Sequence, residues 1–259
     1  MTESVVQSLD RWGRSSEDSY FYSVFRTLYR SWFRVEWEGL ENLPRSGGAL
    51  LVSNHAGMFP VDGGIIAVGV QEELGRPVYG LAHHGFFKYP FLGAALERFG
   101  AVAGHPDNAH RLLKEDQSLV MVFPEGGKGP VKPPSERYRL QRFGRGGFVE
   151  TAMRAGVPIV PIALMGTEDA TPVLAQLRAW GNDFPLTLNA LMFGPILGAF
   201  APFPAKIRGR VLPPVQWDDP TDLEHYSRSV VMDRSEAIRA DMQDALDSLI
   251  RNRKSIWTG

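Results

Sequence analysis

Short apolar runs alternate along the chain with segments whose apolar residues recur at helical spacing. The apolar runs have the length and the boundaries of buried strands, and they cover residues 49–53, 78–81, 101–103, 119–123 and 158–164. The helical patterns between them cover residues 61–73, 90–99, 108–115 and 147–155. This alternation predicts an α/β fold, a single-domain sandwich in which helices flank a largely parallel central sheet. Because the sequence contains no internal repeat and no low-complexity linker, we expect one domain over residues 35–259.

Residues 1–34 are predicted to form a polar tail followed by an amphipathic helix. The helix carries two adjacent stripes, an apolar one of Phe21, Phe25, Leu28 and Trp32 and a basic one of Arg26, Arg30 and Arg34. We favour a helix whose apolar stripe packs on the domain. The alternative is a helix that lies on an anionic bilayer, with its aromatic rings inserted and its arginines at the headgroups.

Two later segments also have a marked apolar character. Residues 185–205 contain no charged residue, and four prolines and two glycines interrupt any long helix there. Burial in the core is the favoured interpretation of this segment, and a hydrophobic surface that faces a membrane is the alternative. Residues 226–253 have one apolar face, which predicts an amphipathic helix packed on the domain.

The composition is that of a globular protein, since 44% of the 259 residues are hydrophobic and 22% are charged. The 28 basic and 29 acidic side chains leave a net charge of −1, so no overall field attracts a nucleic acid. The absence of cysteine excludes disulfides, cysteine-ligated metals and a thiol nucleophile. Asp10 and Arg11 stand where a signal peptide needs its apolar core, and no charge-free apolar run is long enough for a conventional membrane span. We therefore expect a cytoplasmic protein.

Several catalytic motifs are absent from the sequence. It contains no Gly-x-Ser-x-Gly nucleophile elbow and no His-Glu-x-x-His metal motif, and the glycines before Lys128 do not have the spacing of a Walker P-loop. His83 and His84 are adjacent, so their side chains project differently and make a poor pair of metal ligands. We therefore predict no metal site.

The first candidate for chemistry is His55, in the sequence Ser53-Asn54-His55 at the end of a predicted strand. Asp62 follows seven residues later, at the start of a predicted helix. Ligands of α/β proteins bind where strands lead into helices, at the carboxyl ends of the strands. An imidazole oriented by a carboxylate can take a proton from an alcohol near neutral pH. The protein would then need no nucleophile of its own.

The second candidate is a loop at the end of another predicted strand, Phe123-Pro124-Glu125-Gly126-Gly127-Lys128. Its glycines allow backbone N–H groups to approach an anion or a polar headgroup. From residue 128 to residue 145 the sequence has six basic residues and one acidic residue; the basic ones are Lys128, Lys132, Arg137, Arg139, Arg142 and Arg145. A solvated run of charge is the simpler interpretation. Arg145, however, comes directly before a predicted helix, and a helix amino end with basic residues suits phosphate.

These motifs, in this order, resemble the glycerolipid (lysophospholipid) acyltransferase family. The similarity runs from about residue 37 to residue 207 and includes Gly39-Leu40-Glu41-Asn42-Leu43-Pro44 and Val157-Pro158-Ile159-Val160-Pro161. Its most specific part is the pair formed by Asn54-His55 and Phe123-Pro124-Glu125-Gly126, about 70 residues apart. Two features depart from the family pattern. Six residues instead of four separate His55 from Asp62, and His105 stands where the family usually has an arginine associated with phosphate binding.

The resemblance implies transfer of a fatty acyl group from coenzyme A or acyl carrier protein to a hydroxyl group of a lysophospholipid such as 1-acyl-glycerol-3-phosphate. His55 would be the general base and Asp62 its orienting partner, in a direct attack on the thioester without an acyl-enzyme or a cofactor. The remaining residues assigned to substrate binding are Asn54, His105, Glu125, Gly126, Gly127, Lys128, Arg137, Arg139, Arg142 and Arg145. We expect peripheral association with the inner face of the cell membrane.

Two alternatives to this function remain open from the sequence. One is an acyltransferase for a neutral or glycolipid acceptor. The other is a lipid-binding protein of the same fold that has lost catalysis.

Overall fold

The computed structural model describes residues 9–15, 20–56, 61–179, 182–194, 198, 201–221, 223 and 226–259. Within them, seven strands form one sheet in the order β1-β9-β6-β2-β5-β3-β4. The strands are β1 (Glu36–Glu38), β2 (Ala49–Ser53), β3 (Val78–Ala82), β4 (Ala101–Ala103), β5 (Leu119–Val122), β6 (Ile159–Met165) and β9 (Arg208–Val211). The five strands from β6 to β4 are parallel, and β9 pairs with β6 in the antiparallel sense. The predicted α/β class with a largely parallel sheet is confirmed.

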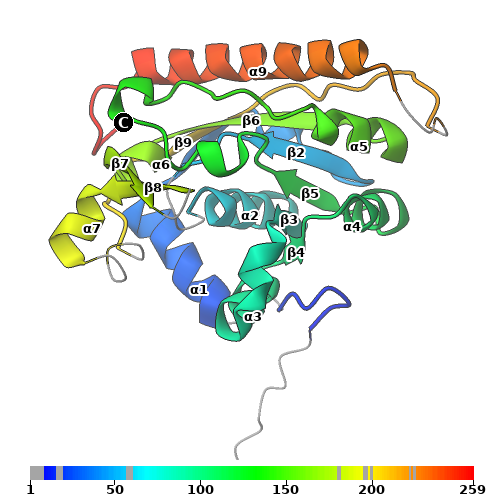
Figure 1. Cartoon of the computed structure of the whole chain (residues 1–259). Coiled ribbons are helices and arrows are strands. Elements are labelled where there is room, and N and C mark those ends of the chain that lie inside the picture. Colours follow the sequence, from blue (N-terminus) through cyan, green and yellow to red (C-terminus); the bar gives the residue numbers. More distant parts are fainter. Residues whose placement is uncertain are drawn as a thin grey trace, which may run out of the picture.

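Helices cover both faces of the sheet (Figure 1). One face carries α4 (Pro106–His110), α5 (Gly147–Ala155) and α9 (Arg228–Arg251), and the other carries α1 (Tyr20–Thr27), α2 (Val61–Leu74) and α3 (Pro90–Arg98). Alternate residues of β2 point to the two faces, so Leu50 belongs to the core under α9 and Leu51 to the core under α2. Burial on both faces explains why the central strands read as continuous apolar runs.

The structure contains four strands that the apolar pattern did not predict. β1 and β9 are short strands with alternating polar residues, so neither produces an apolar run. β7 (Val173–Ala179) and β8 (Asn182–Thr187) form a separate antiparallel hairpin after β6. The helix predicted over residues 108–115 consists of α4 and a π-helical turn over Arg111–Glu115.

The helix at residues 20–34 packs on the domain. α1 is followed by a π-helical turn over Leu28–Trp32, and Phe25 is buried against α2, with its ring 5.3 Å from that of Phe99. Gly64 of α2 permits this approach, because a Cβ atom there would lie 2.2 Å from the Phe25 ring. Leu28 also packs on the core. Phe25 and Leu28 of the apolar stripe therefore face the domain, whereas Trp32 is exposed. The side chain of Phe21 is outside the described part.

The basic stripe beside it makes contacts within the protein as well. Arg26 and Arg30 pair with Glu72 of α2, and Arg34 donates to the backbone oxygen of Pro204 at 2.8 Å. These pairs leave less positive charge available to lipid headgroups than the sequence suggested.

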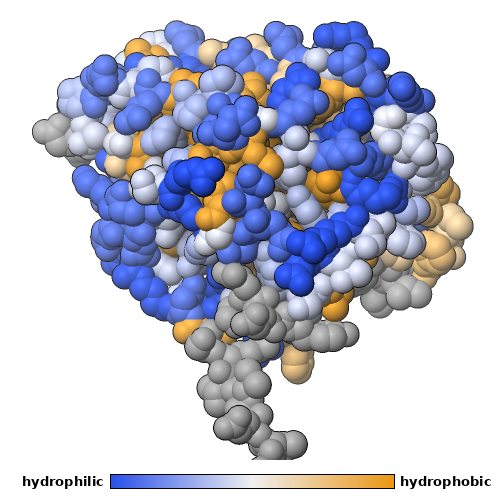
Figure 2. Space-filling model, turned by 180° about the vertical axis from the view of Figure 1, so that it is seen from behind, coloured by the Kyte–Doolittle hydropathy of each residue, from blue (hydrophilic) through white to orange (hydrophobic). Residues whose placement is uncertain are grey.

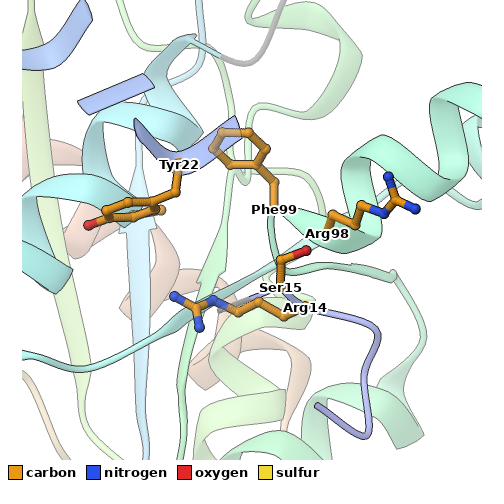
Figure 3. A pocket seen from close by; sticks show the side chains of 6 residues that line it. Arg14, Ser15, Tyr22, Arg98 and Phe99 are labelled. Carbon is orange, nitrogen blue, oxygen red and sulfur yellow. The ribbon is translucent and has the colours of Figure 1, made fainter. Parts of the chain in front are cut away.

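Residues 9–15 lie against the amino ends of β3 and β4. The Tyr79 hydroxyl donates to the Asp10 carboxylate at 2.6 Å, and the backbone N–H of Ser15 donates to the backbone oxygen of Arg98 at 3.1 Å. Figure 3 shows the small hollow that results, lined by Arg14, Ser15, Tyr22, Ala67, Arg98 and Phe99. It lies where Phe99 leads into β4, at the end of the sheet opposite to the loops that follow β2 and β5.

The expectation that residues 185–205 are buried is wrong for α7 (Leu188–Phe193). Leu191, Met192 and Phe193 are exposed, whereas Asn189 is buried and donates to the backbone oxygen of Ala201 at 2.7 Å. A segment without charges thus places only part of its surface in the core. Residues 195–197, 199 and 200 lie outside the described part. Among the helices that the structure describes, none is long and apolar enough to cross a membrane.

Candidate active site

The side chains of His55 and Asp62 meet at the carboxyl end of β2, where α2 begins. Nδ1 of His55 lies 2.6 Å from Oδ2 of Asp62, although residues 57–60 between them are outside the described part. The Asp62 carboxylate is fully buried and accepts hydrogen bonds from the backbone N–H groups of Ala56 and Gly63 at 2.9 and 2.8 Å. These contacts hold the carboxylate in one orientation toward the imidazole.

The contact with Asp62 fixes which ring nitrogen of neutral His55 carries the proton. A carboxylate accepts, so Nδ1–H donates and Nε2 keeps its lone pair. The ring stacks on Phe123 with centroids 4.4 Å apart, and 21% of the His55 side chain is exposed. Burial lowers the pKa of His55, but the charge and hydrogen bond of Asp62 and the charge of Glu125 together outweigh it. The pKa therefore lies above its ordinary value of 6.5.

Glu125 holds the backbone of His55 in place. It follows β5, the neighbour of β2, and its side chain is buried. Oε1 accepts the backbone N–H of His55 at 3.0 Å, and Oε2 accepts that of Gln141 at 2.8 Å. Both oxygens thus have partners within the protein, and a direct contact of Glu125 with substrate stays a prediction.

A set of paired charges extends from Glu125 to the carboxyl end of β6. The site assignment from sequence included Glu125 and Arg137 of this set and missed Lys132, Glu168, Asp169 and Arg253. Nζ of Lys132 lies 3.3 Å from Glu125 and 2.7 Å from Glu168, which belongs to α6 (Thr167–Ala170). Asp169, the next residue, pairs with Arg137 and Arg253. Acidic residues directly after a buried strand were a signal for Glu168 and Asp169. No sequence pattern indicated Arg253, which is 84 residues from Asp169.

Tyr138 lies within the same charged set. Its hydroxyl donates to Asp169 and accepts from the backbone N–H of Gly166, and burial together with the charge of Glu168 raises its pKa to about 12. Its backbone has a φ of +61°, which few residues other than glycine adopt. A hydrogen bond of 2.8 Å from its N–H to Glu168 stabilises this conformation.

Asn54 makes structural contacts. Its side-chain amide both donates to and accepts from the backbone of Leu164 in β6, at 2.9 and 2.8 Å, and it is fully buried. The amide thus continues the pairing of β2 with β6 beyond the end of the strand. A contact of Asn54 with substrate would require it to leave these bonds.

The glycines of the Glu125 loop divide into two kinds. Gly126 and Gly127 are exposed, and a Cβ atom at either would meet nothing within 4 Å. Gly129 is pressed against His55, because its Cβ atom would lie 2.8 Å from the His55 carbonyl oxygen. Lys128, the residue before Gly129, is exposed, so this loop presents backbone and one cation directly before the residue that contacts His55.

The other residues assigned to binding are dispersed. Arg139, Arg142 and Arg145 are exposed, and no contact between described residues brings them to His55. His105 follows β4 at the edge of the sheet, where its Nδ1 accepts from the backbone N–H of Asp107 at 3.2 Å and caps α4. The structure therefore groups only part of the basic segment with the His55–Asp62 pair.

A cavity of about 290 Å³ opens beside Ala56, the neighbour of His55. Its wall is formed by the loop after β5 and the start of β7, and it consists of Ala56, Gly129, Pro130, Lys132, Pro133, Pro134, Arg137, Glu168, Thr171, Pro172, Val173 and Leu174. The wall is largely apolar, and Lys132, Arg137 and Glu168 all have ionic partners. The described residues contain no cluster of His, Asp and Glu that could hold a metal ion.

The chain is similar to several known proteins. A protein of Mycobacterium tuberculosis without an assigned function is 38% identical over 243 residues, which are 91% of this chain and 67% of that protein. A bovine protein named "DGAT1/2-independent enzyme synthesizing storage lipids" is 25% identical over 231 residues, 87% of this chain and 67% of its own. The chloroplastic 1-acyl-sn-glycerol-3-phosphate acyltransferase of Arabidopsis thaliana is 33% identical over 151 residues, 54% of this chain and 38% of its own.

Among solved structures, the 1-acyl-sn-glycerophosphate acyltransferase of Thermotoga maritima shares the fold. The match has a TM-score of 0.57 at 18% identity and covers 90% of this chain and 81% of the other. The model of the acyltransferase family matches residues 34–165, which include β2, the His55–Asp62 pair, the Glu125 loop and β6. The chain therefore belongs to the acyltransferase family and is an enzyme that transfers an acyl group.

Proposed function

We propose that this enzyme transfers a fatty acyl group from a thioester of coenzyme A or acyl carrier protein to a hydroxyl group of a lysophospholipid, such as 1-acyl-glycerol-3-phosphate. One observation carries the proposal: a buried carboxylate orients an imidazole 2.6 Å away and leaves the other ring nitrogen as the base. The name of the chloroplastic relative, a 1-acyl-sn-glycerol-3-phosphate acyltransferase, supports the acceptor class.

In the proposed reaction, Nε2 of His55 takes the proton of the acceptor hydroxyl as its oxygen attacks the thioester carbonyl. The tetrahedral intermediate collapses, the C–S bond breaks, and the imidazolium returns its proton to the departing thiolate. Asp62 stabilises the imidazolium between these two steps. The chain provides no cysteine, and the attack by the acceptor itself makes an acyl-enzyme unnecessary.

The exposed loop of Gly126, Gly127 and Lys128 is the proposed contact for the acceptor headgroup. Its glycines leave room for a phosphate, and Lys128 supplies an exposed cation directly before Gly129, which contacts His55. A neutral lipid alcohol is a second candidate acceptor, because Lys132 and Arg137 of the adjacent cavity are already neutralised by acidic partners.

The release of free thiol from an acyl thioester, measured with a panel of acceptors, tests the reaction and its acceptor. Turnover with 1-acyl-glycerol-3-phosphate supports the lysophospholipid. Turnover only with monoacylglycerol or another neutral alcohol supports the second candidate. No release with any acceptor, from either thioester of coenzyme A or of acyl carrier protein, would refute the proposed reaction.

We also propose that the enzyme binds peripherally to the inner face of the cell membrane, through an apolar rim on both sides of the site. β6 and β3 flank the strand pair that leads to His55 and Glu125, and each continues into a segment with exposed apolar side chains. The rim consists of Phe86, Tyr89, Phe91 and Leu92 after β3, and Leu174, Leu177, Leu191, Met192 and Phe193 after β6. Apolar side chains gather at the right-hand edge of Figure 2, where α7 projects. Exposed apolar surface of this kind suits a lipid interface.

A further inference from the structure

A buried lysine joins two carboxylates beside the His55–Asp62 pair. The side chain of Lys132 is 3% exposed, and its Nζ lies 2.7 Å from Oε1 of Glu168 and 3.3 Å from Oε2 of Glu125. We propose that Lys132 is a positioning residue, whose ammonium group keeps both carboxylates ionised so that they hold the loops around His55. This inference rests on the proposed role of His55 as the base.

The two carboxylates need a cation because both are buried and share one neighbour. Like charges in such a site cannot both persist, and one carboxylate would take up a proton. Burial lowers the pKa of Lys132, but the charges of Glu168 and Glu125 outweigh it and raise the pKa above its ordinary value of 10.5. The ammonium group therefore stays charged at neutral pH.

Each carboxylate uses its charge to bind backbone N–H groups of a loop at the site. Glu125 accepts from His55 and Gln141, and Glu168 accepts from Tyr138, whose left-handed backbone needs that support. Charge-assisted hydrogen bonds of this kind are stronger than those to a neutral carboxyl group. Loss of the cation should therefore loosen the backbone of His55 without removing any group that touches substrate.

The test compares K132M with K132M/E168Q, and K114M is the control because Lys114 is an exposed lysine of the π-helical turn after α4. A displacement of about 1 Å can cost on the order of 10²-fold in rate, so we expect a loss of about that size in kcat for K132M, with a smaller change in KM. The double variant removes one carboxylate together with the cation, so Glu125 can ionise alone. We expect the kcat of the double variant to be about tenfold higher than that of K132M, because the effects of coupled groups are non-additive. K114M should match the wild type.

A second measurement does not depend on activity. In K132M we expect the native state to keep one proton on the pair of carboxylates, whereas the unfolded chain releases that proton above pH about 4. Because the native state then binds more protons than the unfolded state, the Tm of K132M should fall as the pH rises. K132M/E168Q should not show this fall relative to the wild type. If K132M does not fold, folding of the double variant supports the proposal.

Wild-type kcat in K132M would overturn the proposal, as would a double variant that is no better than K132M or does not fold. The proposal would also be overturned if the Tm of K132M had the same pH dependence as the Tm of the wild type. A wild-type enzyme that releases no thiol with any acceptor would instead refute the proposed reaction, and the Tm comparison would still decide the role of Lys132.

Discussion

At the scale of single residues, the proposed chemistry depends on how Asp62 holds His55. The Asp62 carboxylate is fully buried and accepts hydrogen bonds from two backbone N–H groups. It lies 2.6 Å from Nδ1 of His55, so the imidazole has one orientation. The exposed fraction of the His55 side chain shows that the ring is still reachable from outside. The pair thus combines a rigid support with an accessible base.

Removing the imidazole should abolish most turnover. We expect H55A to lose about 10²–10⁴-fold in kcat, which is the usual contribution of positioned proton transfer. D62N should lose much of the same activity, and the double variant should be little worse than H55A because the two residues act as one unit. Losses that multiply in the double variant would mean that Asp62 acts independently of His55. Circular dichroism on each variant checks that the fold is retained.

The raised pKa of His55 predicts the pH dependence of turnover. The base must be neutral, so kcat/KM should fall as the pH drops through a value above 6.5. D62N removes the charge that raises this pKa and leaves only a neutral acceptor for Nδ1–H, while burial continues to lower the pKa. The acid limb of the pH profile should therefore move to lower pH in D62N. An unchanged limb would show that another group controls this ionisation.

At the scale of elements, the packing of α1 on α2 decides the role of the amino-terminal helix. Phe25 reaches Gly64 closely, and Phe33, which follows the π-helical turn, is fully buried in the core under α2. Deletion of residues 1–34 would remove Phe33 from that core, so such a truncation tests stability more than membrane binding.

The substitution G64A tests this packing directly. Its new Cβ atom would lie 2.2 Å from the Phe25 ring, so α1 must shift, and we expect a loss of about 1–3 kcal/mol in the free energy of unfolding. In an F25A background the obstacle is absent, and G64A should cost much less there. Urea unfolding of the four proteins measures both effects. Equal costs in the two backgrounds would contradict the contact.

At the scale of the whole molecule, the proposed lipid surface lies on segments that follow the carboxyl ends of β3 and β6. These segments flank the loops of His55 and Glu125 because parallel strands place their carboxyl ends at one edge of the sheet. A lipid acceptor could then move between the membrane and the site over a short path.

Polar substitutions in the apolar rim should weaken binding to vesicles. We expect F91S and L191S, at side chains that are 94% and 59% exposed, to reduce sedimentation with anionic phosphatidylglycerol vesicles. Turnover of a detergent-solubilised acceptor should change much less. V230S is the matched control, because Val230 is an exposed apolar residue of α9 on the other face of the sheet. Equal sedimentation of all four proteins would refute the rim as the membrane contact.

The sequence by itself determined the five parallel strands of the central sheet, the family and the residues of the proposed base. The strands around β2 and β5 are buried on both faces, so their apolar runs were legible, and the resemblance to the acyltransferase family is confirmed. The sequence did not predict β1, β9 or the β7–β8 hairpin, because half-exposed strands carry polar residues and lack a continuous apolar run.

Only the tertiary structure decided which charged residues meet and which apolar residues stay exposed. Lys132 contacts Glu168 and Arg253 contacts Asp169 because the carboxyl end of β6 lies beside the loop after β5 and the end of α9. Such partners are set by strand order, which local patterns do not encode. The local sequence likewise does not decide whether Phe25 and Leu191 are buried or exposed, because both lie in apolar segments. The first is covered by α2 and the second projects from α7, and a hydrophobic side chain cannot by itself specify whether another element will cover it.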